Sequence, residues 1–408
     1  MRSDRRHGPG PTSRRTRASR PVTAVALVLA LLAAACSSGD TNAKGDAADK
    51  TTTTVASRGD EPAYAEPGPY KVGFTTMRMD DRDVNVWYPA DAAATTGKPK
   101  ATYDQATPLP DKLKGLVPKA YNTVVTMDAY ADAPANTEGP FPVLLFAHGA
   151  GGYGLVNSGI EVGMASWGFV VVAVDYLEYG LVAQVTGAGR ATKRPTEAEM
   201  RQRSRQSTKR MLASLDLVQA EGEKADSVLH GAVDASRAAS SGHSAGGAVA
   251  WGALADPRVK VAIGWAPVPA AEEPVDKPTM IIGATGDSAL TPAELAKTYA
   301  GFPAPKRFVE IGPAGHNTFT DICGVIRQGG GLVEFARQNK LVSENLLELA
   351  YNGCTEKDLE GSEFWPVVQH FTVAGIRDAL GIDSPPVGLG DGIESAFAGV
   401  TIRYVHNP

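Results

Sequence analysis

Short, uninterrupted apolar runs recur between residues 142 and 311, and they limit the folds that this chain can adopt. A run that is apolar at every position is typical of a strand covered on both faces of a sheet. Helix-like segments separate the runs, and this alternation predicts an α/β fold with a largely parallel sheet and helices on both faces. The expected strands span 142–147, 169–175, 238–241, 259–265, 279–283 and 307–311, and the expected helices span 159–166, 196–221, 246–255 and 292–300.

Two segments of different character precede this alternating region. Residues 70–76 and 83–88 are expected to form an opening antiparallel hairpin around the turn Asp80-Asp81-Arg82. Residues 91–139 contain several prolines and no clear periodicity, and a stretch of that length is often either a functional cover or a disordered insertion. We therefore expect one domain over 66–408, with 91–139 as a candidate lid insertion.

The start of the chain has the pattern of an export signal. Seven arginines precede the apolar run Val22–Ala35, which is shorter than the roughly 20 residues that cross a bilayer as a helix. A basic start, a short apolar centre and small residues at the end predict a signal peptide over 1–35. The ending Leu-Ala-Ala-Ala-Cys resembles the lipobox of bacterial lipoproteins, which implies a lipid on Cys36, with unanchored secretion as the alternative. Residues 36–65 are expected to be a low-complexity tether.

The formal net charge of −5 is the sum of two unlike parts. Residues 1–35 contain seven Arg and one Asp, whereas the remaining 373 residues carry 33 basic and 44 acidic side chains, a net charge of −11. An acidic body repels polyanions, so we expect neither DNA nor RNA as a partner.

One glycine-rich motif suggests a nucleotide cofactor. Residues 149–154 fit G-x-G-x-x-G between an expected strand and an expected helix, and Asp175 ends the next strand 21 residues later. That is the full dinucleotide-binding fingerprint, in which the glycines admit a pyrophosphate and the acidic residue binds a ribose hydroxyl. Two points count against an NAD enzyme. The hairpin and the insertion precede the glycine-bearing strand, and an exported protein would meet little NAD.

A second motif suggests a serine nucleophile. Residues 242–246 fit G-x-S-x-G, with Ser244 between the expected strand 238–241 and the helix that begins near Gly246. The flanking glycines leave room for a strained strand-to-helix turn. The turn also places the backbone N–H of Ala245 at a helix start, where it can bind developing negative charge.

The residues after the later strands decide between the two motifs. A nucleophile-elbow enzyme needs an acid after one later strand and a histidine after the last one. Asp287 follows the strand 279–283, and His316 follows the strand 307–311. Both fall just past the carboxyl end of a strand, where open α/β sheets place their chemistry. The sequence therefore favours a hydrolase, and the glycine-rich loop becomes the source of its other oxyanion donor.

Several motifs together resemble the α/β-hydrolase superfamily: HGAGG (148–152), GHSAGG (242–247), IIGATGD (281–287) and GPAGHNTF (312–319). The closest resemblance is to bacterial platelet-activating-factor acetylhydrolase-like and dienelactone-hydrolase-like esterases, with cutinase-like polyesterases nearby, and it covers roughly residues 66–380. The resemblance implies an α/β-hydrolase fold with Ser244 as the nucleophile, His316 as the base and Asp287 as the acid. Asp175 is the fallback acid.

The same resemblance implies further roles. The backbone N–H groups of Ala150 and Ala245 form the oxyanion hole, and His243 supports the turn that carries the nucleophile. Trp265 lines the acyl pocket, with core packing as the equal alternative. His370 and His406 are expected to be core or surface histidines without a catalytic role.

The three cysteines divide into one lipid attachment and one pair. An exported chain meets an oxidising environment, where paired thiols persist, so Cys323 and Cys354 are expected to form a disulfide. Two free thiols are the alternative. The bridge would close a loop of about 30 residues and stabilise the fold by roughly 3–4 kcal/mol in the chain-entropy model.

These observations predict an exported serine hydrolase that cleaves carboxylic esters with short or medium acyl chains through an acyl-enzyme. Acetylated phospholipids are among its candidate substrates. A cutinase-like polyesterase or lipase is the alternative within this class, and a lipoprotein that binds hydrophobic ligands without turnover is the alternative from another class. We expect no cofactor and no metal, because H-E-x-x-H and clustered Cys/His patterns are missing from the sequence. We also expect a monomer that takes a small ester or lipid substrate and reaches the outer face of the bacterial membrane only through its lipid.

Overall fold

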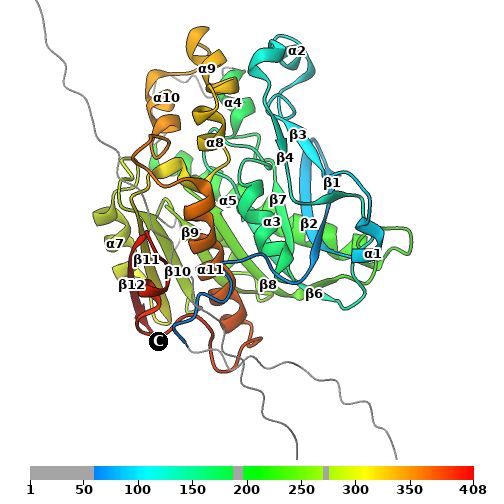
Figure 1. The fold of residues 1–408 in the computed structure, drawn as a ribbon, viewed down its shortest axis with the longest axis vertical. Coiled ribbons are helices and arrows are strands. Elements are labelled where there is room, and N and C mark those ends of the chain that lie inside the picture. The colour runs from blue at the N-terminus through cyan, green and yellow to red at the C-terminus, as the bar shows by residue number, and fades with distance from the viewer. Residues whose placement is uncertain (1–58, 187–195, 270–274) are drawn as a thin grey trace, which may run out of the picture. The chain divides into compact units, whose positions relative to one another are not determined.

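The computed structural model describes residues 59–186, 196–269 and 275–408. Its centre is a ten-stranded sheet in the order β12-β11-β10-β9-β8-β6-β7-β2-β1-β5 (Figure 1). The strands of this sheet are β1 (Lys71–Met79), β2 (Arg82–Ala90), β5 (Tyr130–Ala131), β6 (Phe141–Ala147), β7 (Val170–Val174), β8 (Val233–His243), β9 (Val259–Trp265), β10 (Thr279–Ala284), β11 (Lys306–Gly312) and β12 (Thr401–Asn407).

The strands from β7 to β11 are parallel, and most of the strands outside them are antiparallel to their neighbours. β6 pairs with β7 and β8 in parallel, and the parallel register continues through β9 and β10 to β11. The hairpin of β1 and β2 joins β7 in antiparallel fashion, and β12 runs antiparallel to β11. The carboxyl ends of the parallel strands therefore share one edge of the sheet, where such folds bind their ligands.

Helices cover both faces of the sheet, and each face has its own apolar core. The helices α3 (Ser158–Ser166) and α11 (Gly361–Ala379) cover one face and lie in front of the sheet in Figure 1. The other face packs against α5 (Glu197–Glu223), α6 (Ala245–Ala253) and α7 (Pro292–Gly301). Both cores are built from buried aliphatic and aromatic side chains, which supply the main driving force for folding.

Two segments extend beyond the sheet and its helices. The insertion, residues 91–139, contributes β5 to the edge of the sheet and otherwise contains α1 (Ala92–Thr95), β3 (Thr102–Asp104), α2 (Asp111–Lys114), η1 (Lys119–Tyr121) and β4 (Val124–Thr126). The second segment follows η2 (His316–Phe319) and contains α8 (Ile322–Arg327), α9 (Gly331–Gln338) and α10 (Glu344–Tyr351). Figure 1 places α2, α9 and α10 at the same end of the fold. Two short helices, α4 (Leu181–Val185) and η3 (Ile393–Ala396), complete the described elements.

The predicted elements and the observed ones agree from the hairpin to β11. All six predicted core strands and all four predicted helices are present, with bounds that shift by a few residues. The sequence did not predict β12, α11, the helices α8 to α10, α4 or the short elements within 91–139. β12 is an edge strand whose side chains are half-buried or exposed, so it lacks the apolar run that marked the other strands.

The folded body begins earlier than the predicted boundary at residue 66. The Tyr64 side chain is buried, and its ring packs edge-on against Trp167 at a centroid distance of 4.9 Å. Its backbone N–H donates to Nδ1 of His370 at 3.2 Å, and its hydroxyl donates to Asp383. Residues at the end of the predicted tether therefore belong to the domain, because they complete the packing around α11. The predicted signal peptide 1–35 and Cys36 lie outside the described residues.

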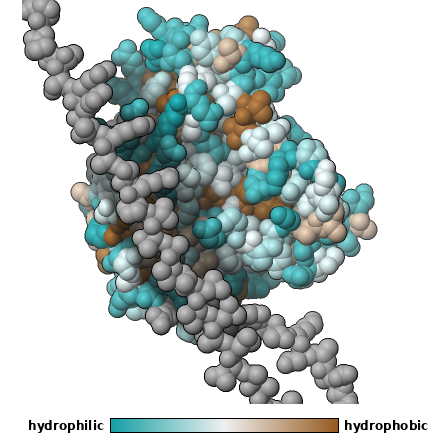
Figure 2. All heavy atoms as spheres, viewed as in Figure 1, coloured by the Kyte–Doolittle hydropathy of each residue, from teal (hydrophilic) through white to brown (hydrophobic). Residues whose placement is uncertain are grey.

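The visible surface is more hydrophilic than the core. On the face seen in Figure 2, hydrophilic residues predominate, and hydrophobic ones form small separate groups. Across the described ranges, no helix combines the length and the apolar character that crossing a membrane requires.

Candidate active site

Ser244 lies at the sharp turn between β8 and α6. Its φ of 54° and ψ of −118° lie outside the regions that side-chain-bearing residues normally occupy, and such strain typically costs about 1–3 kcal/mol. The strain is held by the surrounding backbone. The N–H of Ser244 donates to the carbonyl of Trp265 at 2.9 Å, and its own carbonyl accepts the N–H groups of Gly247 and Val268, both at 2.9 Å. The turn therefore presents the Ser244 side chain at the carboxyl edge of the sheet.

The glycines on either side of Ser244 are sterically required. A Cβ on Gly242 would overlap the carbonyl of Gly246, and a Cβ on Gly246 would overlap the carbonyl of Ala147 on β6. These obstacles are backbone atoms, which cannot turn aside as a flexible side chain can. The G-x-S-x-G spacing thus reflects close packing of β8, α6 and β6, in addition to the room for a strained turn that the motif predicted.

Asp287 and His316 meet directly beside this turn. Asp287 follows β10 and His316 follows β11, and the distance between Asp287 Oδ2 and His316 Nδ1 is 2.8 Å. The other carboxylate oxygen accepts the N–H groups of Ala289 and Leu290, both at 2.8 Å. Since Nδ1 of His316 is engaged by the acid, Nε2 is the ring nitrogen left for Ser244. Both His316 and Ser244 line the same cavity.

His243 supports the loop of the candidate base. Its Nε2 donates to the carbonyl of His316 at 2.9 Å, and the two rings lie 4.7 Å apart between centroids. Burial, together with the nearby His316, lowers the pKa of His243 well below its usual range. A neutral ring with its proton on Nε2 fits this contact, because a carbonyl only accepts. His243 thus supports the loop of the candidate base, whereas the sequence predicted support of the turn that carries Ser244.

Two backbone N–H groups flank the candidate nucleophile. Ala245 begins α6, and Ala150 belongs to the glycine-rich loop after β6. The loop lies against the elbow, since a Cβ on Gly149 would be only 3.1 Å from Cβ of Ser244. Among the described residues, neither the N–H of Ala150 nor that of Ala245 has a hydrogen-bond partner. Both groups are therefore available to a substrate oxygen.

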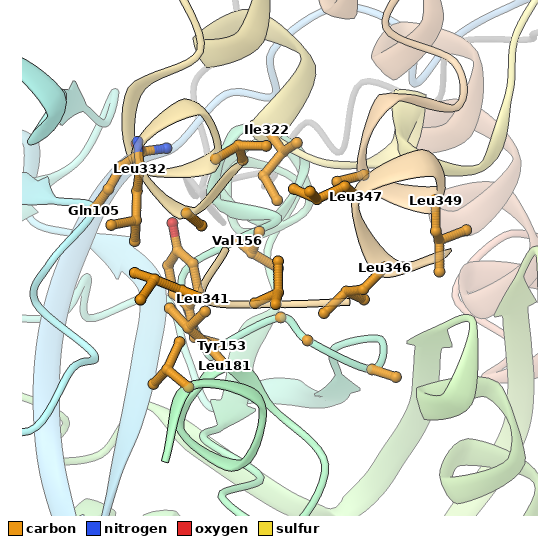
Figure 3. A pocket seen from close by; sticks show the side chains of 18 of the residues that line it. Gln105, Tyr153, Val156, Leu181, Ile322, Leu332, Leu341, Leu346, Leu347 and Leu349 are labelled. Atoms are coloured by element: carbon orange, nitrogen blue, oxygen red, sulfur yellow. The ribbon is translucent and has the colours of Figure 1, made fainter. Parts of the chain in front are cut away.

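A cavity of about 360 Å³ contains Ser244 and His316 in its wall. Most of the remaining wall is aliphatic, which is typical of pockets that bury the apolar part of a small molecule. Figure 3 shows side chains from distant parts of the chain pointing into one space. Aliphatic side chains among those labelled there are Val156, Leu181, Ile322, Leu332, Leu341 and Leu346.

The cavity wall comes largely from the two segments that extend beyond the sheet. The insertion supplies Leu109, Leu113 and Val117, among others, and the segment with α8 to α10 supplies most of the leucines. The two segments also contact each other. Gln105 accepts the N–H of Leu332 at 3.0 Å, and the ring of Tyr121 packs on that of Phe335. The insertion was a candidate lid from its sequence, whereas no sequence pattern pointed to the second segment.

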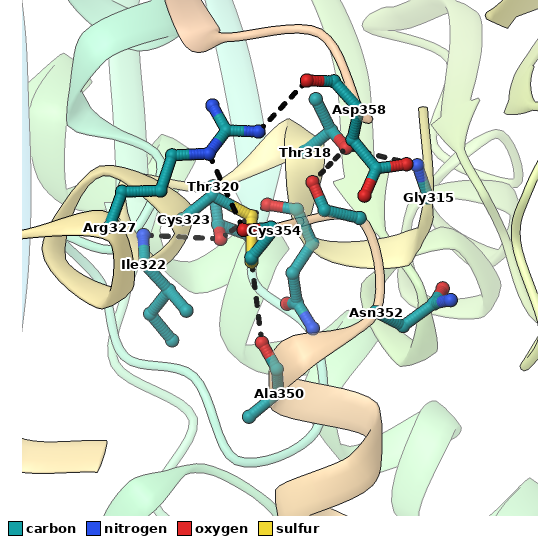
Figure 4. Close-up of a disulfide and its surroundings, with 12 residues drawn as sticks. Gly315, Thr318, Thr320, Ile322, Cys323, Arg327, Ala350, Asn352, Cys354 and Asp358 are labelled. Atoms are coloured by element: carbon teal, nitrogen blue, oxygen red, sulfur yellow. Dashed lines mark hydrogen bonds between the residues drawn. A yellow bond between two sulfur atoms is a disulfide. The ribbon is translucent and has the colours of Figure 1, made fainter. Parts of the chain in front are cut away.

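A disulfide joins Cys323 and Cys354, as predicted, and closes the segment that carries α9 and α10 (Figure 4). We call residues 323–354 the disulfide-closed segment. Arg327 reinforces the closure, since its guanidinium donates to the carbonyls of Cys354, Thr355, Asp358 and Leu359. The segment begins only seven residues after His316, so the bridge fixes one wall of the cavity close to the candidate base.

Two residues considered in the sequence analysis lie away from the candidate chemistry. Trp265 is fully buried, donates to Thr372 Oγ1 at 3.1 Å and stacks on Phe319, and it is not part of the described cavity wall. Its position therefore supports core packing over the predicted role in the acyl pocket. Asp175, the fallback acid, lies 3.5 Å from Nε2 of His148 and not beside His316, which Asp287 already engages.

The described residues offer no metal centre. Within 59–186, 196–269 and 275–408, no group of three or more His, Cys, Asp or Glu side chains could hold a metal ion. The glycine-rich loop 149–154, which fits the dinucleotide-binding motif, lies against Ser244 and lines the candidate active-site cavity.

Comparisons with known proteins agree with this geometry. The family model described as platelet-activating factor acetylhydrolase, isoform II, matches residues 56–210. The model described as PET hydrolase-like matches residues 191–327, a range that contains Ser244, Asp287 and His316. These matches confirm the predicted resemblance to α/β-hydrolase esterases and the expectation of a carboxylic ester hydrolase.

The curated proteins yield no match. Among solved structures, a ferulic acid esterase from Streptomyces cinnamoneus is similar with a TM-score of 0.59. The alignment covers 85% of this chain and 99% of that chain, at 22% sequence identity. This structural likeness confirms the α/β-hydrolase fold.

Proposed function

We propose that this protein is an exported serine esterase that cleaves carboxylic esters with an apolar acyl or alcohol group, using Ser244, His316 and Asp287. The observation that carries the proposal is the 2.8 Å contact between Asp287 and His316, where His316 lines one cavity together with a serine on a strained turn. An acid, a base and a strained nucleophile held together in this way match the geometry that acyl transfer requires.

The reaction follows from the roles of these groups. As Ser244 Oγ attacks the ester carbonyl, its proton passes to Nε2 of His316, and Asp287 stabilises the cationic ring. The carbonyl oxygen becomes an oxyanion that accepts the N–H groups of Ala150 and Ala245. The C–O bond to the alcohol then breaks, and His316 donates its proton to the departing oxygen. Water attacks the acyl-enzyme by the same route and regenerates Ser244.

The aliphatic cavity wall supports an ester that has a sizeable apolar group. A pocket of about 360 Å³ lies at the lower end of the range for small-molecule sites, and burying each methylene in it contributes about 0.8 kcal/mol. The matched proteins are named for an acetylhydrolase, a PET hydrolase and a ferulic acid esterase. Those names share ester cleavage and differ in the acyl group, so they support the reaction and leave several substrates to compare.

Labelling of the nucleophile tests the proposal. A fluorophosphonate probe is expected to label the wild type and Ser236→Ala, a change at an exposed serine outside the cavity, but not Ser244→Ala. Equal labelling of Ser244→Ala and the wild type would rule the proposal out. Turnover is then compared over p-nitrophenyl esters of increasing acyl length, an acetylated phospholipid and a polyester film. Hydrolysis of none of these would instead favour a lipoprotein that binds hydrophobic ligands.

The proposed location rests on the sequence of the first 36 residues. Cleavage before Cys36 and lipid attachment to its thiol would hold the enzyme at the outer face of the bacterial membrane. One acyl chain binds a membrane only reversibly, so a diacyl anchor is needed for stable attachment. Cys36→Ser is expected to move the protein from the membrane fraction into the soluble fraction without loss of esterase activity. Retention of the variant in the membrane fraction would contradict lipidation.

A further inference from the structure

Asn352 connects the loop of the candidate acid with the loop of the candidate base. It is the C-terminal cap of α10, two residues before Cys354. Its Oδ1 accepts the backbone N–H of His316 at 2.7 Å, and its Nδ2 donates to the carbonyl of Gly286, the residue before Asp287, at 3.2 Å. The N–H of Ser288, the residue after Asp287, also donates to Oδ1, at 3.4 Å. Only one orientation of the amide satisfies all three hydrogen bonds.

The backbone of Asn352 adds a fourth connection to the same place. Its carbonyl accepts the N–H of Asn317 at 2.8 Å, so one residue holds the chain at His316 and at the position after it. Figure 4 draws Asn352 among the residues that surround the disulfide. The sequence alone did not point to this residue, because its partners lie 36 and 66 positions away along the chain.

The position of Asn352 is fixed from several sides. The disulfide follows immediately, and the carbonyl of Gly353 accepts the hydroxyl of Thr318 at 3.0 Å. Gly353 has a φ of 92°, and a Cβ at that position would lie 2.5 Å from Oγ1 of Thr318. The chain therefore reverses direction tightly at Gly353, and this turn holds the Asn352 side chain against the loops that carry Asp287 and His316.

From these hydrogen bonds we propose that Asn352 is a positioning residue that sets the geometry of His316 relative to Asp287. The proposal rests on the function proposed above. The 2.8 Å contact between Asp287 and His316 requires the loops after β10 and β11 to keep a fixed separation, and Asn352 is hydrogen-bonded to both loops. Small displacements of reacting groups are costly, since a shift of about 1 Å can lower a rate about 100-fold.

The proposal predicts an effect on turnover and not on substrate binding. Asn352 is not part of the described cavity wall, although Leu349 and Ala350 in the preceding turn are. Removing its side chain should misplace the base while leaving the apolar wall in place. A residue that only capped α10 would instead change stability, or change KM through the position of these two wall residues.

The variants Asn352→Ala and Asn352→Asp test this distinction. Asn352→Ala removes all three side-chain hydrogen bonds, so kcat is expected to fall by about 10-fold or more with KM within about 3-fold of the wild type. Asn352→Asp keeps the acceptor for His316 and removes the donor to Gly286, so its kcat should lie between those of Asn352→Ala and the wild type. Asn136→Ala is the matched control, because Asn136 also accepts one backbone N–H, from Glu138 at 2.7 Å, in an exposed turn.

The outcomes separate this proposal from the proposed function. If the wild type and Ser244→Ala both lack turnover, the proposed function fails. If the wild type turns over and Asn352→Ala keeps its kcat, or differs from the wild type only in substrate affinity, the positioning role is overturned. Equal decreases in Asn352→Ala and Asn352→Asp also overturn it, because the acceptor would then have no effect. If Asn352→Ala does not fold, the isosteric Asn352→Asp decides, and a wild-type kcat there overturns the proposal.

Discussion

Asp287 and His316 reach each other from the ends of neighbouring parallel strands, with 2.8 Å between Oδ2 and Nδ1. We predict that Asp287→Asn lowers kcat about 10⁴-fold, because an amide in that position favours the wrong ring tautomer. Steady-state kinetics on a soluble ester measure the effect.

Asp175→Asn provides the matched control for this variant. Asp175 lies beside His148, so its replacement should leave kcat far closer to the wild type. The opposite ranking of the two variants would show that Asp175, and not Asp287, serves the base.

Leu346 is predicted to select for longer acyl groups. Its Cδ1 lies 3.4 Å from where a Cβ on Gly151 would be, so the side chain borders the cavity next to the glycine-rich loop. Leu346→Ala should lower kcat/KM for an octanoyl ester by about 4-fold for each methylene group of the substrate that is no longer buried, and should change the acetyl ester little. Val124→Ala, at an exposed position of the insertion, should change neither. Equal decreases on both esters would argue against a role in selectivity.

The disulfide is predicted to stabilise the domain by roughly 3–4 kcal/mol in the chain-entropy model, given its separation of 31 residues. The double variant Cys323→Ser/Cys354→Ser should show that decrease in denaturant unfolding. A reductant should destabilise the wild type to the level of the variant and leave the variant unchanged. A reductant effect on the variant would mean that the stabilisation has another source.

His370 is predicted to make stability depend on acidity. Burial lowers the pKa of His370 to about 4, against an ordinary value near 6.5. Its Nδ1 accepts the N–H of Tyr64 and its Nε2 donates to the carbonyl of Gly388, an arrangement that only the neutral ring allows. The unfolded chain therefore binds the proton more readily, and this contribution is present above about pH 6.5 and lost as pH falls toward 4.

The decrease in stability amounts to roughly 3–4 kcal/mol at most, since each unit of pKa shift corresponds to about 1.4 kcal/mol. Chemical denaturation at several pH values is the measurement. His370→Gln should be less stable at pH 8 and should show a flatter dependence below pH 6.5. His406→Gln, at a half-exposed histidine on β12, should follow the wild type, and identical pH curves for all three proteins would contradict the prediction.

The elements of the candidate site could be located from the sequence because each has a strong local signature. The elbow at Ser244 needs glycines at fixed positions, and the ends of buried parallel strands mark where Asp287 and His316 belong. Backbone geometry within a few residues sets these requirements, so short sequence motifs reveal them.

The second segment of the cavity wall, and the residues that act through distant partners, could not be predicted in the same way. Leu332 and Leu346 belong to short, partly exposed helices, and they contact the insertion and the glycine-rich loop only in the folded protein. The apolar pattern of these helices alone therefore does not reveal their role. Asn352 and Tyr64 act through partners far away in the chain. Tertiary interactions of this kind leave no periodic signal.

The closed ends of the disulfide-closed segment have a practical consequence for engineering. Its two terminal Cα atoms lie only 4.6 Å apart, so the stretch between them resembles a removable cassette. Shortened or foreign loops inserted after α8 and before Asn352 would meet the same pair of anchor points. The selectivity of this enzyme could therefore be redesigned by exchanging one contiguous stretch of gene, with Ser244, Asp287 and His316 left unchanged.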